Sequence, residues 1–230
     1  MSATAQTSAD RPAPPLPPDP ARLLAATGVH KAYQRWRWPR PRRVPVLMGA
    51  DLSLERGEVV GLVGENGSGK TTLMRILVGD LAADAGTVQL TGTLGYCPQQ
   101  PVVYPRLTCD EHFELFGGAY RMTAARLHEA RLALYEELGF ERFAATRADQ
   151  LSGGTLAKLN LGLALLPDPD ILLLDEPYAG FDWDTYQKFW GLVAQRRARG
   201  RSVLIVSHFI ADQQRFDRIV TLREGRAWSV

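Results

Sequence analysis

The feature that most constrains this chain is a glycine-rich segment of the form G-x-x-x-x-G-K-[ST], which reads Gly64-Glu65-Asn66-Gly67-Ser68-Gly69-Lys70-Thr71. Glycines let backbone amides turn inward and approach oxygen anions closely. The lysine supplies positive charge for the outer phosphates, and the final hydroxyl is a ligand for Mg²⁺. The segment therefore predicts a loop that binds a nucleoside triphosphate.

The residues on either side have the pattern that such a loop needs. The apolar run 59–63 predicts a buried strand that ends at the loop, and residues 72–78 predict the helix that follows it. The N-terminus of a helix favours negative charge, so it would face the phosphates. A Gly/Ser-rich turn that matches by chance is the alternative, and the order of strand, loop and helix argues against it.

Composition narrows the class of protein. A chain of 230 residues with 45% hydrophobic residues is large enough for one domain with a core. Its 27 Lys and Arg balance 25 Asp and Glu, so the net charge of +2 does not indicate a nucleic-acid partner. We find no run long enough to span a bilayer and no secretory signal, and we expect a cytoplasmic protein. Cys97 and Cys109 lack metal-type spacing and are interpreted as small buried residues, not as a disulfide.

The N-terminal part combines an unusual composition with two expected strands. Residues 1–20 are rich in Ala and Pro and predict a disordered leader, with the folded domain at 21–230. Strands are expected at 23–33 and 44–54. Between them lies Arg35-Trp36-Arg37-Trp38-Pro39-Arg40-Pro41-Arg42-Arg43. Such a segment is able to contact anionic lipid or nucleic acid, but we favour an extended, solvated hairpin tip with proline breaks.

The rest of the chain alternates strands and helices. Helical spacing runs through 108–143, with a helix stop at Gly139, and further helices are expected at 156–166 and 185–197. Strands are expected at 87–90, 93–96, 171–174 and 202–206. Strands that alternate with helices predict an α/β fold with a parallel sheet covered on both faces.

A second chemical signal, Asp175-Glu176, follows the aliphatic run 171–174. Ligands bind at the carboxyl ends of the strands in such sheets. Asp175 is placed to hold Mg²⁺ through water, and Glu176 is placed to orient or deprotonate an attacking water. Two acids that merely close a strand at the surface are the alternative, which the buried character of the strand disfavours.

A third signal is Leu151-Ser152-Gly153-Gly154-Thr155, just before an expected helix. Its two glycines allow backbone amides to approach an anion at the helix N-terminus. Taken alone, the serine is equally explained as a helix cap.

From about Leu23 to the C-terminus, the chain resembles the ATPase subunits of ATP-binding cassette (ABC) transporters. The resemblance implies a P-loop NTPase core with a parallel sheet, a small antiparallel β-subdomain and an α-helical subdomain at about 104–165. Five motifs occur in the order of that family: Gly64–Thr71, Gln99 after Gly95-Tyr96-Cys97-Pro98, Leu151–Gly154, Leu174-Asp175-Glu176-Pro177 and Ser207-His208.

The resemblance also implies a role for each matching residue. Glu176 would be the catalytic carboxylate, His208 would contact the γ-phosphate, and Asp182 would belong to the loop that crosses to a second subunit. ATP would be bound by Tyr33, which stacks on adenine, and by Gly64, Glu65, Asn66, Gly67, Ser68, Gly69, Lys70, Thr71, Thr72 and Gln99. Mg²⁺ would be bound by Thr71, Gln99 and Asp175. The ATP of the partner subunit would be contacted by Ser152, Gly153 and Gly154.

Some of these positions have simpler explanations. Tyr33 is also explained as a strand aromatic, Gln100 leaves the assignment of Gln99 open by one position, and His208 is also explained as a capping or solvated residue. The sequence departs from the family at Thr155, where Gln is usual, so contacts to ATP across the dimer would be weaker.

The implied function is hydrolysis of ATP by two subunits that close head to tail and energise a separate transmembrane permease. The subunit would lie on the inner face of the membrane through that permease. Residues 104–108, with Glu111 and 115–117, are similar to the ATPases of two-component exporters of drugs, peptides or polysaccharides. The alternatives are a soluble ABC ATPase without a transport role and a non-hydrolysing nucleotide switch, which Thr155 suggests.

Overall fold

Three strands with apolar residues on both faces form the centre of the structure: β3 (Val59–Val63), β6 (Ile171–Asp175) and β7 (Ser202–Val206). The structure is a computed structural model that describes residues 22–37, 40–178, 180–207 and 213–229. The predicted leader, 1–20, lies outside these ranges. The three strands are buried along nearly their whole length, which explains why they are continuous aliphatic runs in the sequence.

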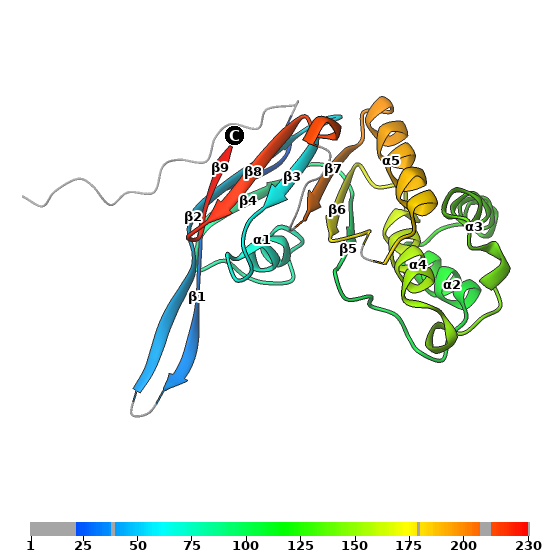
Figure 1. Cartoon of the computed structure of the whole chain (residues 1–230), viewed down its shortest axis with the longest axis horizontal. Coiled ribbons are helices and arrows are strands. Elements are labelled where there is room, and N and C mark those ends of the chain that lie inside the picture. Colours follow the sequence, from blue (N-terminus) through cyan, green and yellow to red (C-terminus); the bar gives the residue numbers. More distant parts are fainter. Residues whose placement is uncertain (1–21, 38–39, 179, 208–212, 230) are drawn as a thin grey trace, which may run out of the picture.

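These strands belong to a six-stranded sheet with the order β5-β6-β7-β3-β8-β9 (Figure 1). Pairing is parallel from β5 (Leu94–Cys97) through β8 (Arg218–Arg223), and β9 (Arg226–Ser229) pairs antiparallel with β8. All the parallel strands therefore end at the same edge, which is where the phosphate loop after β3 and the Asp175-Glu176 pair at the end of β6 fall.

The two faces of the sheet are covered by different layers. Side chains alternate along each strand, so Leu172 and Leu174 pack into one core with helices, whereas Ile171 and Leu173 pack into a second core. The first core includes residues of α4 (Gly153–Leu165) and α5 (Trp183–Ala198), and the second those of α1 (Lys70–Leu77) and the antiparallel sheet.

The antiparallel sheet has the order β2-β1-β4, made by β1 (Arg22–Arg37), β2 (Arg40–Glu55) and β4 (Ala85–Leu90). Its hairpin is longer than expected, because β1 and β2 pair through Trp36 with Pro41 and Arg37 with Arg40. The extended hairpin is confirmed, but most of the Arg/Trp segment lies in the strands and not in a separate tip. Pro41 is tolerated because β2 is an edge strand.

The segment 108–143, where helical spacing is predicted, forms two helices: α2 (Cys109–Ala119) and α3 (Ala124–Leu138). The separation arises at 120–123, because Thr123 caps a new helix. Gly139 ends α3 in the left-handed conformation, as predicted. Short 3₁₀ turns follow at Glu141–Phe143 and Ala148–Gln150, and a third lies at Gln213–Arg215.

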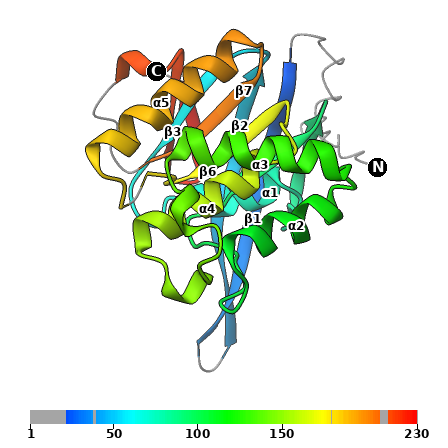
Figure 2. The same ribbon diagram turned by 90° about the vertical axis from the view of Figure 1, so that its right-hand side faces the viewer.

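The helices α2, α3 and α4 gather beyond the β5–β6 edge of the sheet, away from the antiparallel sheet (Figures 1 and 2). The architecture therefore contains the parallel sheet, the antiparallel sheet and the helical region that the sequence predicts. In the described part of the chain, each helix is too short or too polar to cross a membrane.

Candidate functional site

The phosphate loop joins β3 to α1 in the predicted order. A Cβ atom at Gly64 would lie 2.3 Å from the Leu222 carbonyl oxygen and 2.7 Å from the Ser68 hydroxyl oxygen. No larger residue fits there without a backbone shift, so the glycine lets the loop lie directly against β8. The close packing fixes the path of the loop at the end of the sheet.

The start of α1 is open to an anion. Its N-cap residue, Gly69, provides no side-chain hydrogen bond, and the first turn contains no acidic residue. The Ser68 hydroxyl is buried without a hydrogen-bond partner in the described part of the chain. Backbone N–H groups and a buried hydroxyl that await acceptors fit the phosphate oxygens of a nucleotide.

Lys70 places a cation inside this loop. The side chain is only 6% exposed, and its ammonium donates hydrogen bonds to the carbonyls of Gly64 (2.6 Å) and Glu65 (3.0 Å). Burial lowers the pKa of Lys70, and the nearby carboxylates of Glu176 and Asp175 act in the opposite direction. The ammonium is thus held between the loop and the two acids.

The two acids at the end of β6 have different environments. Asp175 is 2% exposed, whereas Glu176 is half-buried. Glu176 has a φ of 53°, a left-handed conformation that is costly for a residue with a Cβ atom, at about 1–3 kcal/mol. Its N–H group donates to the Val206 carbonyl at 3.0 Å. Such strain is characteristic of functional positions, because selection for function maintains it.

Gln99 reaches this pair from the end of the neighbouring strand, β5. Its amide nitrogen donates a hydrogen bond to the Glu176 carboxylate at 3.0 Å. The two residues are 77 positions apart in the chain, and the parallel pairing of β5 with β6 brings them together. The contact favours Gln99 over Gln100 as the residue beside the acids.

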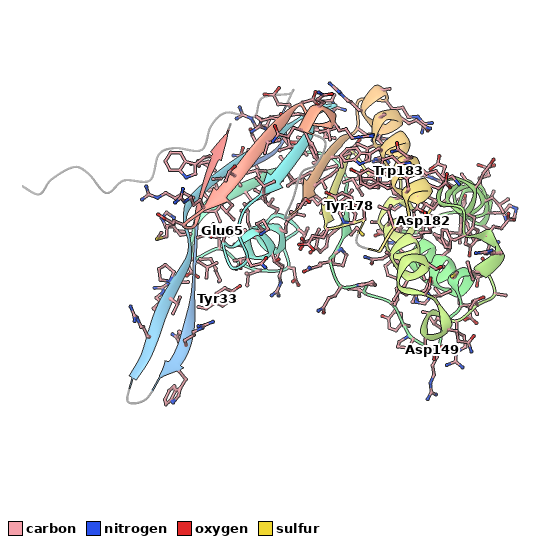
Figure 3. The ribbon with its side chains drawn as sticks, in the orientation of Figure 1. Tyr33, Glu65, Asp149, Tyr178, Asp182 and Trp183 are labelled. Atoms are coloured by element: carbon pink, nitrogen blue, oxygen red, sulfur yellow. The ribbon has the colours of Figure 1, made fainter. Side chains whose placement is uncertain are left out.

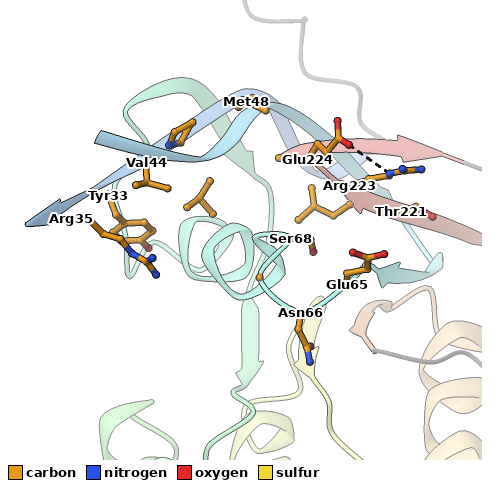
Figure 4. A pocket seen from close by; sticks show the side chains of 16 residues that line it. Tyr33, Arg35, Val44, Met48, Glu65, Asn66, Ser68, Thr221, Arg223 and Glu224 are labelled. Carbon is orange, nitrogen blue, oxygen red and sulfur yellow. Dashed lines mark ion pairs between the residues drawn. The ribbon is translucent and has the colours of Figure 1, made fainter. Parts of the chain in front are cut away.

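Two cavities flank the loop. The first has a volume of about 990 Å³ and is lined by Tyr33 and Arg35 at one end and by the turn between β8 and β9 at the other (Figure 4). Of the predicted ATP-binding residues, it brings together Tyr33, Gly64, Glu65, Asn66, Gly67 and Ser68. The Tyr33 hydroxyl lies 3.4 Å from the Thr72 hydroxyl at the start of α1.

The second cavity, of about 590 Å³, is lined by residues of α1, β5, α2 and α4, among others. It brings together the three predicted metal ligands, Thr71, Gln99 and Asp175. A hydroxyl, an amide and a carboxylate supply the hard oxygen donors that Mg²⁺ prefers. In the described part of the chain, no group of three or more His, Cys, Asp or Glu is placed to hold a metal ion by itself. Mg²⁺ in nucleotide sites commonly uses one or two carboxylates together with phosphate oxygens and water.

One residue of the site escaped the sequence analysis. Asn160 of α4 is 6% exposed and donates hydrogen bonds to the Pro98 carbonyl (2.9 Å) and the Cys97 sulfur (3.1 Å). It therefore fixes the segment that carries Gln99. The signal was a single amide between Leu159 and Leu161, in the stretch 159–165 whose other residues are Leu, Ala or Gly, because a buried amide needs partners.

The serine and glycines of the third motif form the start of α4. Ser152 is the N-cap, and its hydroxyl accepts a hydrogen bond from the Thr155 N–H group at 3.2 Å. Thr155 is buried, and its hydroxyl lies 2.9 Å from that of Ser152. A Cβ at Gly154 would lie 2.7 Å from the Gly180 carbonyl oxygen. Within one chain, this motif is a well-formed helix start.

Asp182 also begins a helix. It caps α5 by accepting a hydrogen bond from the Thr185 N–H group at 2.8 Å, and it lies beside the exposed Trp183 on a different part of the molecule from Tyr33 and Glu65 (Figure 3). Neither cavity includes Ser152, Gly153, Gly154 or Asp182 among its described lining residues. The predicted residue His208 lies outside the described residues.

A phosphate loop between a buried strand and a helix, with an Asp-Glu pair two strands away, defines a P-loop nucleotide-binding protein. Residues 47–179 match the family model described as ABC transporter. The chain belongs to the ABC transporter family, and its α/β fold is that of the family's ATP-binding cassette.

Similar proteins agree with this assignment. The Nod factor export ATP-binding protein I of Burkholderia lata is 35% identical over 194 residues, 79% of this chain and 64% of that protein. The protein of the same name from Ralstonia nicotianae is 31% identical over 217 residues, 89% of this chain and 65% of that protein. The chain thus spans just under two thirds of the length of these relatives.

Solved structures are similar over most of the chain. An ATP-binding subunit of an ABC transporter has a TM-score of 0.82 and 25% identity, with 90% of both chains covered. A dimeric bacterial ABC transporter cassette has a TM-score of 0.80 and 26% identity, with 89% of this chain and 96% of that chain covered.

Proposed function

We propose that this chain is the ATP-hydrolysing subunit of an ABC transporter and that it energises a separate permease, in the direction of export. The observation that carries the proposal is the arrangement around Lys70. A buried ammonium in an open phosphate loop lies close to the Asp175 and Glu176 carboxylates, and Gln99 is bonded to the second of them.

Each group has a distinct role in this proposal. The loop amides and Lys70 hold the outer phosphates, and Tyr33 holds the adenine at the far end of the first cavity. Glu176 accepts a proton from the attacking water or orients it, and the amide of Gln99 keeps the carboxylate in position. Mg²⁺, held by Thr71, Asp175 and Gln99, would neutralise charge that develops on the phosphates.

The site requires a second subunit. The first turn of α4, with Ser152, Gly153 and Gly154, lies outside both cavities, so we place it against the ATP of a partner. The similar cassette that forms a dimer supports this arrangement. Asp182, at the start of α5, belongs to the same interface. His208 is proposed to contact the γ-phosphate on the grounds of sequence alone.

The second cavity suggests where a permease binds. Two of its apolar lining residues, Val102 (65%) and Tyr120 (43%), are exposed, and so is Tyr104 (56%), two residues after Val102 in the chain. Exposed apolar groups of this kind mark protein interfaces. The subunit would then lie at the inner face of the membrane. Similarity to two Nod factor export proteins supports export, without indicating the substrate.

The test is the substitution Glu176→Gln. We expect the rate of MgATP hydrolysis to fall by at least about 100-fold, because the general base is lost, while an ATP-bound dimer accumulates in gel filtration. Glu136→Gln on α3, at an exposed position, is the control and should behave as the unmodified chain. A Glu176→Gln chain that remains monomeric with MgATP, or hydrolyses at the original rate, would contradict the proposal.

A second candidate, a non-hydrolysing nucleotide switch, is favoured by one observation. Thr155 is turned inward against Ser152 and does not extend from the start of α4. A steady-state MgATPase assay of the unmodified chain distinguishes the two functions, because a switch binds ATP without turnover. Purification with the membrane fraction separates the transporter subunit from a soluble ABC ATPase.

A further inference from the structure

The Arg/Trp hairpin, defined as residues 35–37 and 40–43, has no part in the nucleotide site beyond Arg35. It holds five of the chain's 27 Lys and Arg and none of its 25 Asp and Glu. Without it, the rest of the chain has a net charge of −3 instead of +2. The excess of positive over negative charge in the whole chain therefore comes from this short hairpin.

The two strands of the hairpin carry arginines opposite each other, and their charges repel. Arg35 and Arg42, both exposed, are paired directly across the two strands. Like charges directly opposite each other destabilise an antiparallel pair, so the stability of the isolated chain does not account for this sequence. An anionic partner would remove the repulsion.

Its exposed tryptophan points to the nature of that partner. Trp36 is 77% exposed, next to the exposed Arg35 and opposite Pro41. Tryptophan and arginine together are favoured where an apolar layer meets an anionic surface, because the ring enters the interface and the cations remain at the headgroups. Electrostatic attraction to a polyanion alone would not require the ring.

The base of the hairpin is held firmly. Asp84 accepts hydrogen bonds from the Arg43 guanidinium (2.7 Å), the Ala32 N–H group (2.9 Å) and the Lys31 ammonium (3.0 Å). The Arg43 guanidinium, the Ala32 N–H group and the Lys31 ammonium hold the pKa of Asp84 well below its usual range. The hairpin is thus an arm with a fixed direction at its base.

The hairpin points towards the side of the molecule where we place the permease. In both views, the hairpin projects beyond the body of the protein towards the end that the segment between β5 and α2 also reaches (Figures 1 and 2). This segment carries Val102, which lines the second cavity, and the exposed Tyr104. The position of the permease rests on the proposed function, whereas the charge of the hairpin and the exposure of Trp36 do not.

We propose that the Arg/Trp hairpin binds the surface of a membrane that contains anionic phospholipids. The arginines contact the phosphates of the headgroups, and Trp36 enters the interface. The contact is made by this chain itself, in addition to any contact with a permease, and it requires neither ATP nor a second subunit.

The test uses the full chain, phospholipid vesicles and no permease. The variant Trp36→Ala/Arg42→Glu changes two residues that line neither side of the nucleotide site. Its matched control is Trp228→Ala/Arg226→Glu, which removes one exposed Trp and reverses one exposed Arg on β9. Binding is measured by co-sedimentation with phosphatidylcholine vesicles, with or without about one third phosphatidylglycerol, at about 0.05 and 0.15 M salt.

We expect the unmodified chain and the control to bind only the anionic vesicles, more weakly at the higher salt concentration, and the hairpin variant to lose about tenfold in affinity or more. MgATPase activity should be unchanged in both variants, which shows that both are folded. Equal binding by the hairpin variant, binding to neutral vesicles, or tighter hairpin-dependent binding to a single-stranded oligonucleotide would each overturn the proposal. Because the assay contains no ATP, failure here leaves the proposed ATPase function intact.

Discussion

The starts of α1 and α4 are both proposed to contact the triphosphate, yet they are built differently. The N-cap of α1 is Gly69, which contributes no side-chain hydrogen bond, and the hydroxyl before it has no partner in the described part of the chain. The N-cap of α4 is Ser152, whose hydroxyl accepts a hydrogen bond from the Thr155 N–H group. The first start is open within a single chain, and the second is already stabilised by its own residues.

The difference shows where the protein tolerates an unsatisfied helix end. The starts of α2, α3 and α5 are also capped by a side chain, with Thr108, Thr123 and Asp182 as N-caps. A glycine N-cap typically costs a few tenths of a kcal/mol relative to Ser, Thr, Asn or Asp. The start of α1 keeps that cost because the phosphates can supply the missing acceptors, whereas α4 must be stable before a partner arrives.

The largest expected effect is at the open start. Lys70→Ala removes the cation from the loop, and we expect ATP affinity to fall by roughly 10- to 100-fold, since charged hydrogen bonds contribute about 1.5–3 kcal/mol. Isothermal calorimetry measures the affinity. Lys188→Ala on α5, which removes an exposed ammonium paired with Asp184, should leave it unchanged. An unaltered affinity in Lys70→Ala would disprove the assignment of the loop.

A smaller effect is expected at Ser152, where two substitutions distinguish its role as a helix cap from its proposed contact with the ATP of the partner subunit. Ser152→Ala should lower stability by about 1 kcal/mol, or the midpoint of thermal unfolding by about 2–4 °C, because the cap is lost. Ser152→Asp keeps a cap and adds a negative charge. We expect it to unfold near the original temperature but to dimerise poorly with ATP, because the new carboxylate would face the phosphates of the partner.

Gel filtration of both variants with MgATP, in the Glu176→Gln background, completes this comparison. If Ser152 serves only as a cap, then Ser152→Asp will dimerise as the parent does. That result would place the start of α4 away from the ATP of the second subunit.

The sequence predicted the chemistry well wherever the functional residues are consecutive in the chain. Strand 59–63, the loop and the Asp-Glu end of β6 are local patterns, and the structure brings Lys70 close to both acids. The fold class was also accessible, because alternation of strands and helices restricts the architectures that bury both faces of a sheet.

The sequence did not reveal contacts between distant segments. The bond from Gln99 to Glu176 depends on the pairing of β5 with β6, and the bonds from Asn160 to the end of β5 depend on the packing of α4 against the sheet. The length of the Arg/Trp hairpin was also missed. Prolines suggested a break, whereas an edge strand accommodates Pro41.

The smallest expected effect is at α5, where the cap is charged. Hydrogen bonds from the Thr185 hydroxyl and N–H group hold the pKa of Asp182 below its ordinary value of 3.8. A carboxyl whose pKa is lower in the folded state stabilises the protein above the unfolded pKa and loses this contribution as the pH falls through the folded value. Asp182→Asn keeps the cap without the charge.

We therefore expect the unmodified chain to unfold at most about 3 °C above Asp182→Asn at pH 7, and the difference to disappear as the pH falls below 3.8. Scanning calorimetry from pH 7 down to the lowest pH of reversible unfolding measures it. A difference that does not depend on pH would mean that the charge of Asp182 is irrelevant to the helix. In that case only the subunit interface would explain the carboxylate. The start of α5 would then resemble that of α1, which serves the nucleotide, more than that of α4, which its own residues stabilise.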